Sequence, residues 1–167
     1  MFVSKFLSIR VKSWLRRNKT QRSTTAYTSA KRIGVIFCID KSDITTPIED
    51  FVHKLQNDNK EVDILAYFPH KREDYNHRYD CFTPQNISFW GNFNASEITK
   101  FIDQPFDYLY HIDKKPSTII DGILAQSKAK CRIGVYEQDH AGYYELMVNA
   151  NGNDHIQEMY NYTSILN

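Results

Sequence analysis

The sequence predicts a three-layer α/β domain with a mostly parallel sheet, preceded by a basic amphipathic helix. Two observations carry this prediction. Short β-branched apolar runs alternate with stretches whose apolar residues recur every three or four positions, which is the pattern of βαβ units. The runs are nearly continuous, as expected for parallel strands that are buried on both faces. The 167 residues suffice for one such domain with an extension.

We expect two parts, residues 1–30 and residues 31–167. Residues 2–17 read as a helix because their apolar side chains follow a spacing of three and four. Residues 18–30 are small and polar, which is typical of a linker. The apolar face of the helix comprises Val3, Phe6, Leu7, Val11, Trp14 and Leu15.

In the second part, strands and helices are expected to alternate along the chain. A long polar loop over residues 69–84 interrupts this rhythm. Helices are predicted at 45–57, from Ser96 to Phe101, after Ser117, and from Asn153 or Asp154 to about Leu166. Strands are predicted at 32–39, 61–68, 86–90, 106–112, 130–136 and 143–148.

The predicted sheet is Rossmann-like, because right-handed crossovers leave few other arrangements of these elements. We expect the strand order 3-2-1-4-5. Only six residues separate the fifth and sixth predicted strands. Since parallel strands need a longer crossover, the sixth strand is predicted to lie antiparallel at the edge of the sheet.

Charge is distributed unevenly along the chain. Residues 1–32 contain nine lysines and arginines and no acid, and the remainder contains 12 basic and 20 acidic residues, a net charge of −8. This asymmetry predicts an arm that meets phosphates, anionic lipid or the acidic body of the same chain. The helix could lie in a membrane interface, dock into a protein groove or pack on its own domain, and it also resembles an organellar transit peptide. The candidate contact residues are Lys5, Phe6, Arg10, Trp14, Arg16 and Arg17.

A ligand site, if the domain has one, is expected where strands one and four end, because ligands of open α/β sheets bind at this switch point. A histidine beside a carboxylate is suited to proton transfer or to half of a metal site. The competing interpretation is that strand ends are polar because they meet water. The candidate residues are Asp40, Lys41, Asp43, His111 and Asp113.

The sequence argues against cofactor, metal and nucleic-acid binding. The six glycines form neither a GxGxxG nor a GxxxxGK[ST] motif, and carboxylates follow the first strand. The loop residues His70, His77, Asp80 and Cys81 do not complete a metal site. Aromatic and basic residues around them could bind single-stranded nucleic acid, but acidic residues in the same loop lower its positive charge. Three cysteines without a CxxC pair fit a reducing compartment. No apolar run is long enough to span a bilayer.

Several short segments form a recognisable pattern: Phe82-Thr83-Pro84, Phe89-Trp90-Gly91, Phe106–Leu109, Ser127–Lys130 with Arg132-Ile133-Gly134, Glu145-Leu146-Met147 and Tyr162 with Ile165–Asn167. On these segments the chain resembles an uncharacterised family of small Rossmann-like proteins from Bacteroidota, and the resemblance implies no activity. A looser similarity links the FD strand and the S-x-A-x-x-RIG strand to the N-terminal half of heptosyltransferase-like glycosyltransferases. Those enzymes need a second half, for which this chain has no room.

Two functional interpretations follow. The first is a non-enzymatic binding or assembly module whose basic helix contacts a membrane surface or a protein partner. The second is a small ligand-binding domain or enzyme, similar to half of a glycosyltransferase, that uses the switch-point residues. We expect a cytoplasmic protein with peripheral association at the inner membrane, and we prefer the first interpretation because site signatures are absent whereas the charge asymmetry is plain.

Overall fold

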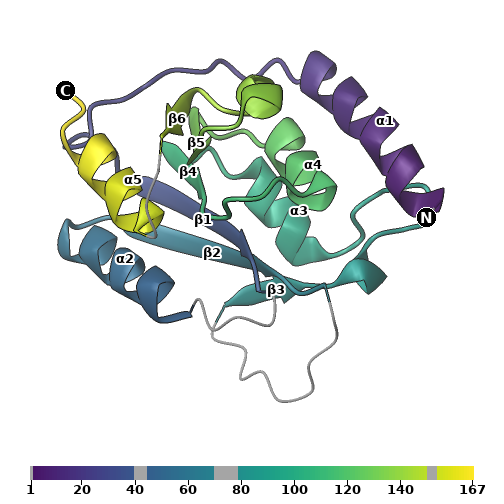
Figure 1. The fold of residues 1–167 in the computed structure, drawn as a ribbon, viewed down its shortest axis with the longest axis horizontal. Helices are drawn as coiled ribbons and strands as arrows, with labels where there is room; N and C mark the ends of the chain where they lie inside the picture. The colour runs from purple at the N-terminus through teal and green to yellow at the C-terminus, as the bar shows by residue number, and fades with distance from the viewer. Residues whose placement is uncertain (1, 40–44, 70–78, 150–153) are drawn as a thin grey trace.

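The computed structural model describes residues 2–39, 45–69, 79–149 and 154–167 (Figure 1). Its centre is a six-stranded sheet with the order β3-β2-β1-β4-β5-β6, in which every neighbouring pair is parallel. The strands are β1 (Arg32–Cys38), β2 (Glu61–Tyr67), β3 (Asp80–Phe82), β4 (Tyr108–His111), β5 (Cys131–Val135) and β6 (Leu146–Val148). The helices are α1 (Phe2–Arg17), α2 (Thr45–Asn57), α3 (Ser96–Asp103), α4 (Thr118–Gln126) and α5 (His155–Ser164), with 3-10 helices η1 (Pro84–Asn86) and η2 (Gln138–Tyr143).

Helices cover both faces of the sheet, which confirms the predicted three-layer Rossmann-like fold. Helices α2 and α5 pack on one face, where Phe51 of α2 contacts Tyr110 of β4 edge to face, with ring centroids 5.0 Å apart. Helices α3 and α4 pack on the other face, where Ile98 and Ile120 are fully buried. Helix α1 forms an additional layer outside α4 (Figure 1).

The predicted antiparallel orientation of the sixth strand is wrong. Strand β6 is parallel to β5, with Ile133 paired to Leu146 and Val135 paired to Val148. The prediction placed the start of this strand at Tyr143, but residues 138–143 form η2 and β6 begins only at Leu146. The ten residues between β5 and β6 suffice for a short crossover, in which η2 takes the place that α2 occupies between β1 and β2 and α4 between β4 and β5.

The third strand also lies elsewhere than predicted. It comprises Asp80–Phe82, within the segment expected to be a loop, whereas residues 86–90 contain the end of η1 and a turn. A strand of three residues is too short to show a periodicity in the sequence. Thr83 follows the strand and caps η1, which begins at Pro84; the Thr83 hydroxyl accepts a hydrogen bond from the Gln85 N–H.

Helix α1 matches its prediction and buries its apolar face on the same chain. Leu7 and Val11 are each 2% exposed and pack against Ala125 of α4. The flanking Trp14 and Leu15 are partly buried in the same cluster. Burial of two such side chains contributes roughly 3–6 kcal/mol to the docking of α1 on α4.

Asp107 links the beginnings of three strands. Its Oδ2 accepts hydrogen bonds from the N–H groups of Lys31 (2.7 Å) and Arg32 (3.0 Å), and its Oδ1 lies 2.7 Å from the Lys130 Nζ. Burial alone would raise the pKa of Asp107, but these donors outweigh it and hold the pKa below its usual value. The ionised carboxylate therefore stabilises the point where β1, β4 and β5 begin.

Replacing Asp107 with Asn is expected to lower the free energy of unfolding by about 2 kcal/mol at pH 7, because hydrogen bonds to a charged group are lost. Since the folded-state pKa lies below the unfolded value, this contribution is present above about pH 4 and disappears as the pH falls through the folded-state pKa. Urea unfolding of both proteins between pH 7 and pH 3 measures it, with the exposed Glu61→Gln as the control. A difference that does not change with pH would contradict this assignment.

Candidate functional site

The predicted switch point is present in the fold. Strands β1 and β4 are neighbours, and the helices that follow them, α2 and α4, lie on opposite faces of the sheet. Asp40, Lys41 and Asp43 lie outside the described residues, whereas His111 and Asp113 are described. The structure brings these last two together, with His111 Nε2 3.0 Å from Asp113 Oδ2.

His111 is enclosed by partners from its own chain. Its side chain is 1% exposed, and its Nδ1 lies 2.6 Å from the Tyr144 hydroxyl. The Asp113 Oδ2 also accepts a hydrogen bond of 2.9 Å from the Cys38 N–H. The hydrogen bonds among these three side chains each have one donor and one acceptor when the Tyr144 hydroxyl donates to Nδ1 and Nε2–H donates to Asp113. Burial raises the pKa of Tyr144, so its hydroxyl keeps the proton that it donates. Both ring nitrogens are therefore engaged, and the group joins β1, β4 and the segment before β6.

Tyr144 reaches His111 because β5 carries a glycine beneath it. A Cβ atom at Gly134 would overlap the Tyr144 ring. The aromatic ring can therefore lie flat over the strand, nearly parallel to the imidazole of His111, with centroids 6.1 Å apart. Gly134 therefore has a packing role. This role could not be predicted from the sequence, in which the glycines form no recognised motif.

A second carboxylate–histidine pair lies beside this group. Asp121 of α4 is 6% exposed and its Oδ2 lies 3.3 Å from His140 Nε2 of η2. Burial raises the pKa of Asp121, against the opposing effect of His140. Sequence reasoning missed this pair, although an acid within the apolar run Ile119–Leu124 was a signal for it.

The described residues hold no group of three His, Cys, Asp or Glu side chains arranged to bind a metal ion. Of the loop residues considered for such a site, Cys81 lies within β3 and Asp80 is exposed at its start, whereas His70 and His77 lie outside the described residues. Cys81 is therefore in a strand and not in the helical turn considered for it.

The outward face of α1 is cationic. Lys5, Lys12, Arg16 and Arg17 are exposed, and in the described part of the chain no carboxylate lies within ion-pair distance of them. Ile9 lies among them and is 67% exposed. The helix thus packs on its own domain through its apolar face, while its charges point away from the acidic body.

A short hairpin presents two aromatic rings beside this face. Ile87 and Phe93 form an antiparallel bridge, and the Gly91 N–H donates to the Ser88 carbonyl at 2.8 Å. This β-turn places Phe89 and Trp90 at its two central positions, where they are 56% and 61% exposed. Gly91 has a φ of 79°, a conformation that favours glycine.

Phe6 of α1 joins these two rings in one cluster. Its ring centroid lies 6.0 Å from Phe89 and 5.8 Å from Trp90, and Phe6 is still 40% exposed. Arg10 ties the turn to the helix by donating to the Trp90 carbonyl at 3.4 Å. We call the whole set the basic–aromatic surface; it comprises Lys5, Phe6, Ile9, Lys12, Arg16, Arg17, Phe89 and Trp90.

The predicted contact residues divide into two groups in the structure. Lys5, Phe6, Arg16 and Arg17 belong to the exposed basic–aromatic surface. Trp14 is instead half-buried against Phe93, with ring centroids 6.0 Å apart, and Arg10 stacks over Trp14 at 5.1 Å. The sequence missed Phe89 and Trp90, because their apolar run reads as a strand.

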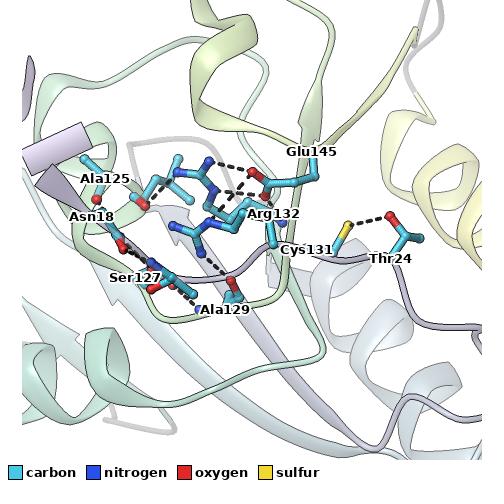
Figure 2. A network of polar contacts seen from close by, with 11 residues as sticks. Asn18, Thr24, Ala125, Ser127, Ala129, Cys131, Arg132 and Glu145 are labelled. Atoms are coloured by element: carbon cyan, nitrogen blue, oxygen red, sulfur yellow. Dashed lines mark hydrogen bonds and ion pairs between the residues drawn. The ribbon is translucent and has the colours of Figure 1, made fainter. Parts of the chain in front are cut away.

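The segment after α1 is fastened to the domain by a polar network (Figure 2). The Asn18 side chain donates to the carbonyls of Ala125 (2.9 Å) and Ser127 (3.0 Å), which satisfies backbone acceptors at the end of α4. Arg22 donates to the Ala129 carbonyl, and its burial, together with nearby Arg132, lowers its pKa to about 10. The polar segment 18–30 is thus held against the body at its beginning; the domain boundary at residue 31 stays a prediction.

At the centre of this network, Arg132 and Glu145 form a bidentate ion pair. The Arg132 side chain is 5% exposed, with Nη2 2.7 Å and Nε 3.0 Å from the two carboxylate oxygens of Glu145. Its Nη1 donates to the Leu124 carbonyl at 3.1 Å. The pair therefore connects β5 and α4 with the residue that precedes β6, next to the segment that follows α1.

Comparison with known proteins places the chain in a family. Residues 4–166 match the family of unknown function DUF6913. The chain belongs to this family. No curated protein and no solved structure matches it. Because DUF6913 is a family of unknown function, the match assigns no activity to the chain.

Replacing Glu145 with Gln is expected to lower the free energy of unfolding by about 3 kcal/mol, because it leaves the buried charge of Arg132 without its counterion. Urea unfolding at pH 7 measures the change. Asp103→Asn is the matched control, since it breaks an exposed pair with Lys128 and should cost about 0.5 kcal/mol or less. Equal losses in the two variants would show that the Arg132–Glu145 pair has no special role.

Proposed function

We propose that this protein is a non-enzymatic module that binds an anionic membrane surface through its basic–aromatic surface. Four exposed cations of α1 have no acidic partner in the described chain, and the exposed Ile9 lies among them. Phe6 of the same helix contacts the exposed rings of Phe89 and Trp90. Tryptophan and phenylalanine favour the boundary between headgroups and acyl chains, and lysine and arginine favour anionic headgroups. The observation that carries the proposal is this combination of exposed cations on α1 with exposed aromatic rings packed against the same helix.

The expected energies are sufficient for reversible binding. Each lysine or arginine near an anionic leaflet contributes about 1 kcal/mol, so Lys5, Lys12, Arg16 and Arg17 together contribute on the order of 4 kcal/mol. Insertion of Phe89 and Trp90 adds apolar burial to this attraction. Within the described residues, none of the helices combines the length and apolar character that a membrane span requires. The proposal is therefore a peripheral contact, which we place at the cytoplasmic side of a bacterial inner membrane.

The two alternative interpretations have less support. Docking of α1 into a groove of another protein would require its apolar face, but Leu7 and Val11 of this face are already buried against α4. A ligand-binding or glycosyltransferase-like site at the switch point would need an accessible His111, but both of its nitrogens are engaged inside the fold.

Vesicle flotation at low ionic strength tests the proposal. The full chain is expected to float with vesicles that contain 30% phosphatidylglycerol, to stay behind with pure phosphatidylcholine, and to be released by high salt but not by moderate salt. The variant Lys12→Glu/Arg16→Glu should bind at least tenfold more weakly, because two attractive charges become repulsive. Phe89→Ser/Trp90→Ser should keep the salt-sensitive encounter but lose the binding that resists moderate salt.

The matched control for the charge variant is Lys115→Glu/Lys128→Glu, which makes the same change in net charge at exposed positions outside the surface. It should float like the unaltered protein. Failure of the unaltered chain to bind anionic vesicles, or equal losses in both double variants, would reject the proposal. Point variants are preferable to a deletion of residues 1–23, which would also remove Leu7, Val11 and the Asn18 contacts.

A further inference from the structure

Among the described residues, strand pairing covers the outer edge of β2 at three of its seven positions. On its inner side, all seven residues of β2 pair with β1, from Glu61 with Arg32 to Tyr67 with Cys38. On its outer side, β3 pairs only with Leu65, Ala66 and Tyr67. Among the described strands, none pairs with the outer edge of residues 61–64, so this stretch has the backbone geometry to accept another strand.

This edge forms the floor of a groove whose volume is about 630 Å³. Helix α2 forms one wall with Val52, His53 and Gln56, and the other wall consists of Lys100 and Phe101 of α3 with Gln104 at its C-terminal cap. Val62 and Ile64 pack toward the core beneath α2 and α5. Because side chains alternate along a strand, Asp63 faces the α3 side.

The lining of the groove is acidic. It includes the carboxylates of Asp63, Asp80 and Glu97, whereas Lys100 is the one lysine or arginine among the described lining residues. A strand bound beside residues 61–64 would place every second side chain next to Asp63 and the others next to Val62 and Ile64. The groove therefore complements a segment in which basic and apolar residues alternate.

A second copy of the chain fits this edge poorly. Pairing of two β2 edges would bring Glu61 and Asp63 of one copy close to the same carboxylates of the other. Like charges across neighbouring strands are destabilising, and charged side chains on an edge are a common protection against self-association. The charge pattern thus disfavours pairing of this edge with a second copy of the chain and favours pairing with a basic segment.

We infer that the groove binds an extended basic peptide segment of another protein, which adds to the sheet as a strand beside residues Glu61–Ile64, in line with β3. Backbone hydrogen bonds to β2 supply the affinity, and the acidic lining supplies the preference for lysine or arginine. The inference is independent of membrane binding, because the groove lies between α2 and α3, whereas the basic–aromatic surface is built on α1 and the 87–93 hairpin.

The test measures fluorescence polarisation of labelled peptides with the full chain and without vesicles. The probe is a peptide of four lysines alternating with three valines, compared with the same peptide carrying glutamate in place of lysine. The lysine peptide should bind saturably and at least tenfold more tightly than the glutamate peptide. A lysine peptide with N-methylated valine amides should lose binding, because backbone donors on one edge are removed.

Asp63→Lys should lower the affinity for the lysine peptide at least tenfold. Asp103→Lys makes an equal charge change on an exposed residue outside the groove and should change this affinity less than twofold. Glu97→Lys serves as a second groove variant, and circular dichroism verifies that each variant is folded. Hydrogen exchange should slow at residues 61–64 when peptide binds. No saturable binding, or binding that survives both N-methylation and the groove variants, would overturn the inference.

Discussion

The proposed function depends on the burial of Leu7 and Val11 of α1 against Ala125 of α4. Once the apolar face of α1 is buried there, its charged face has to point outward, and no electrostatic contact with the acidic body competes for it in the described chain. The same packing positions the aromatic turn, because a Cβ at Gly91 would lie 3.3 Å from the Leu7 backbone. Charge and aromatic rings are therefore arranged by one apolar contact.

The fold could be predicted from the sequence where elements were long and periodic. Strands β1 and β2, helices α1 and α2, and the strand order around β1 follow from apolar runs and right-handed crossovers. The direction of β6 could not be predicted, because it depended on whether a short polar stretch formed a 3-10 helix. Strand β3 was missed since its three residues are held by pairing with β2 and not by their own pattern.

The candidate site was predicted only in part, for a similar reason. The exposed cations of α1 follow from helical spacing, and the proximity of His111 to Asp113 follows from strand alternation. The roles of Phe89 and Trp90 could not be inferred, because their exposure results from a turn that packs against a helix more than 70 residues earlier. Likewise, the enclosure of His111 requires Tyr144, which reaches it only because Gly134 leaves space.

Contact of the aromatic turn with a membrane can be followed through the fluorescence of Trp90. The chain contains two tryptophans, so Trp14→Phe leaves Trp90 as the single reporter. With anionic vesicles, its emission should shift to shorter wavelength, and lipids brominated near the headgroup end of the acyl chain should quench it more than lipids brominated near the bilayer centre. An unchanged spectrum, with no quenching at vesicle concentrations that bind the protein, would show that Trp90 does not enter the membrane.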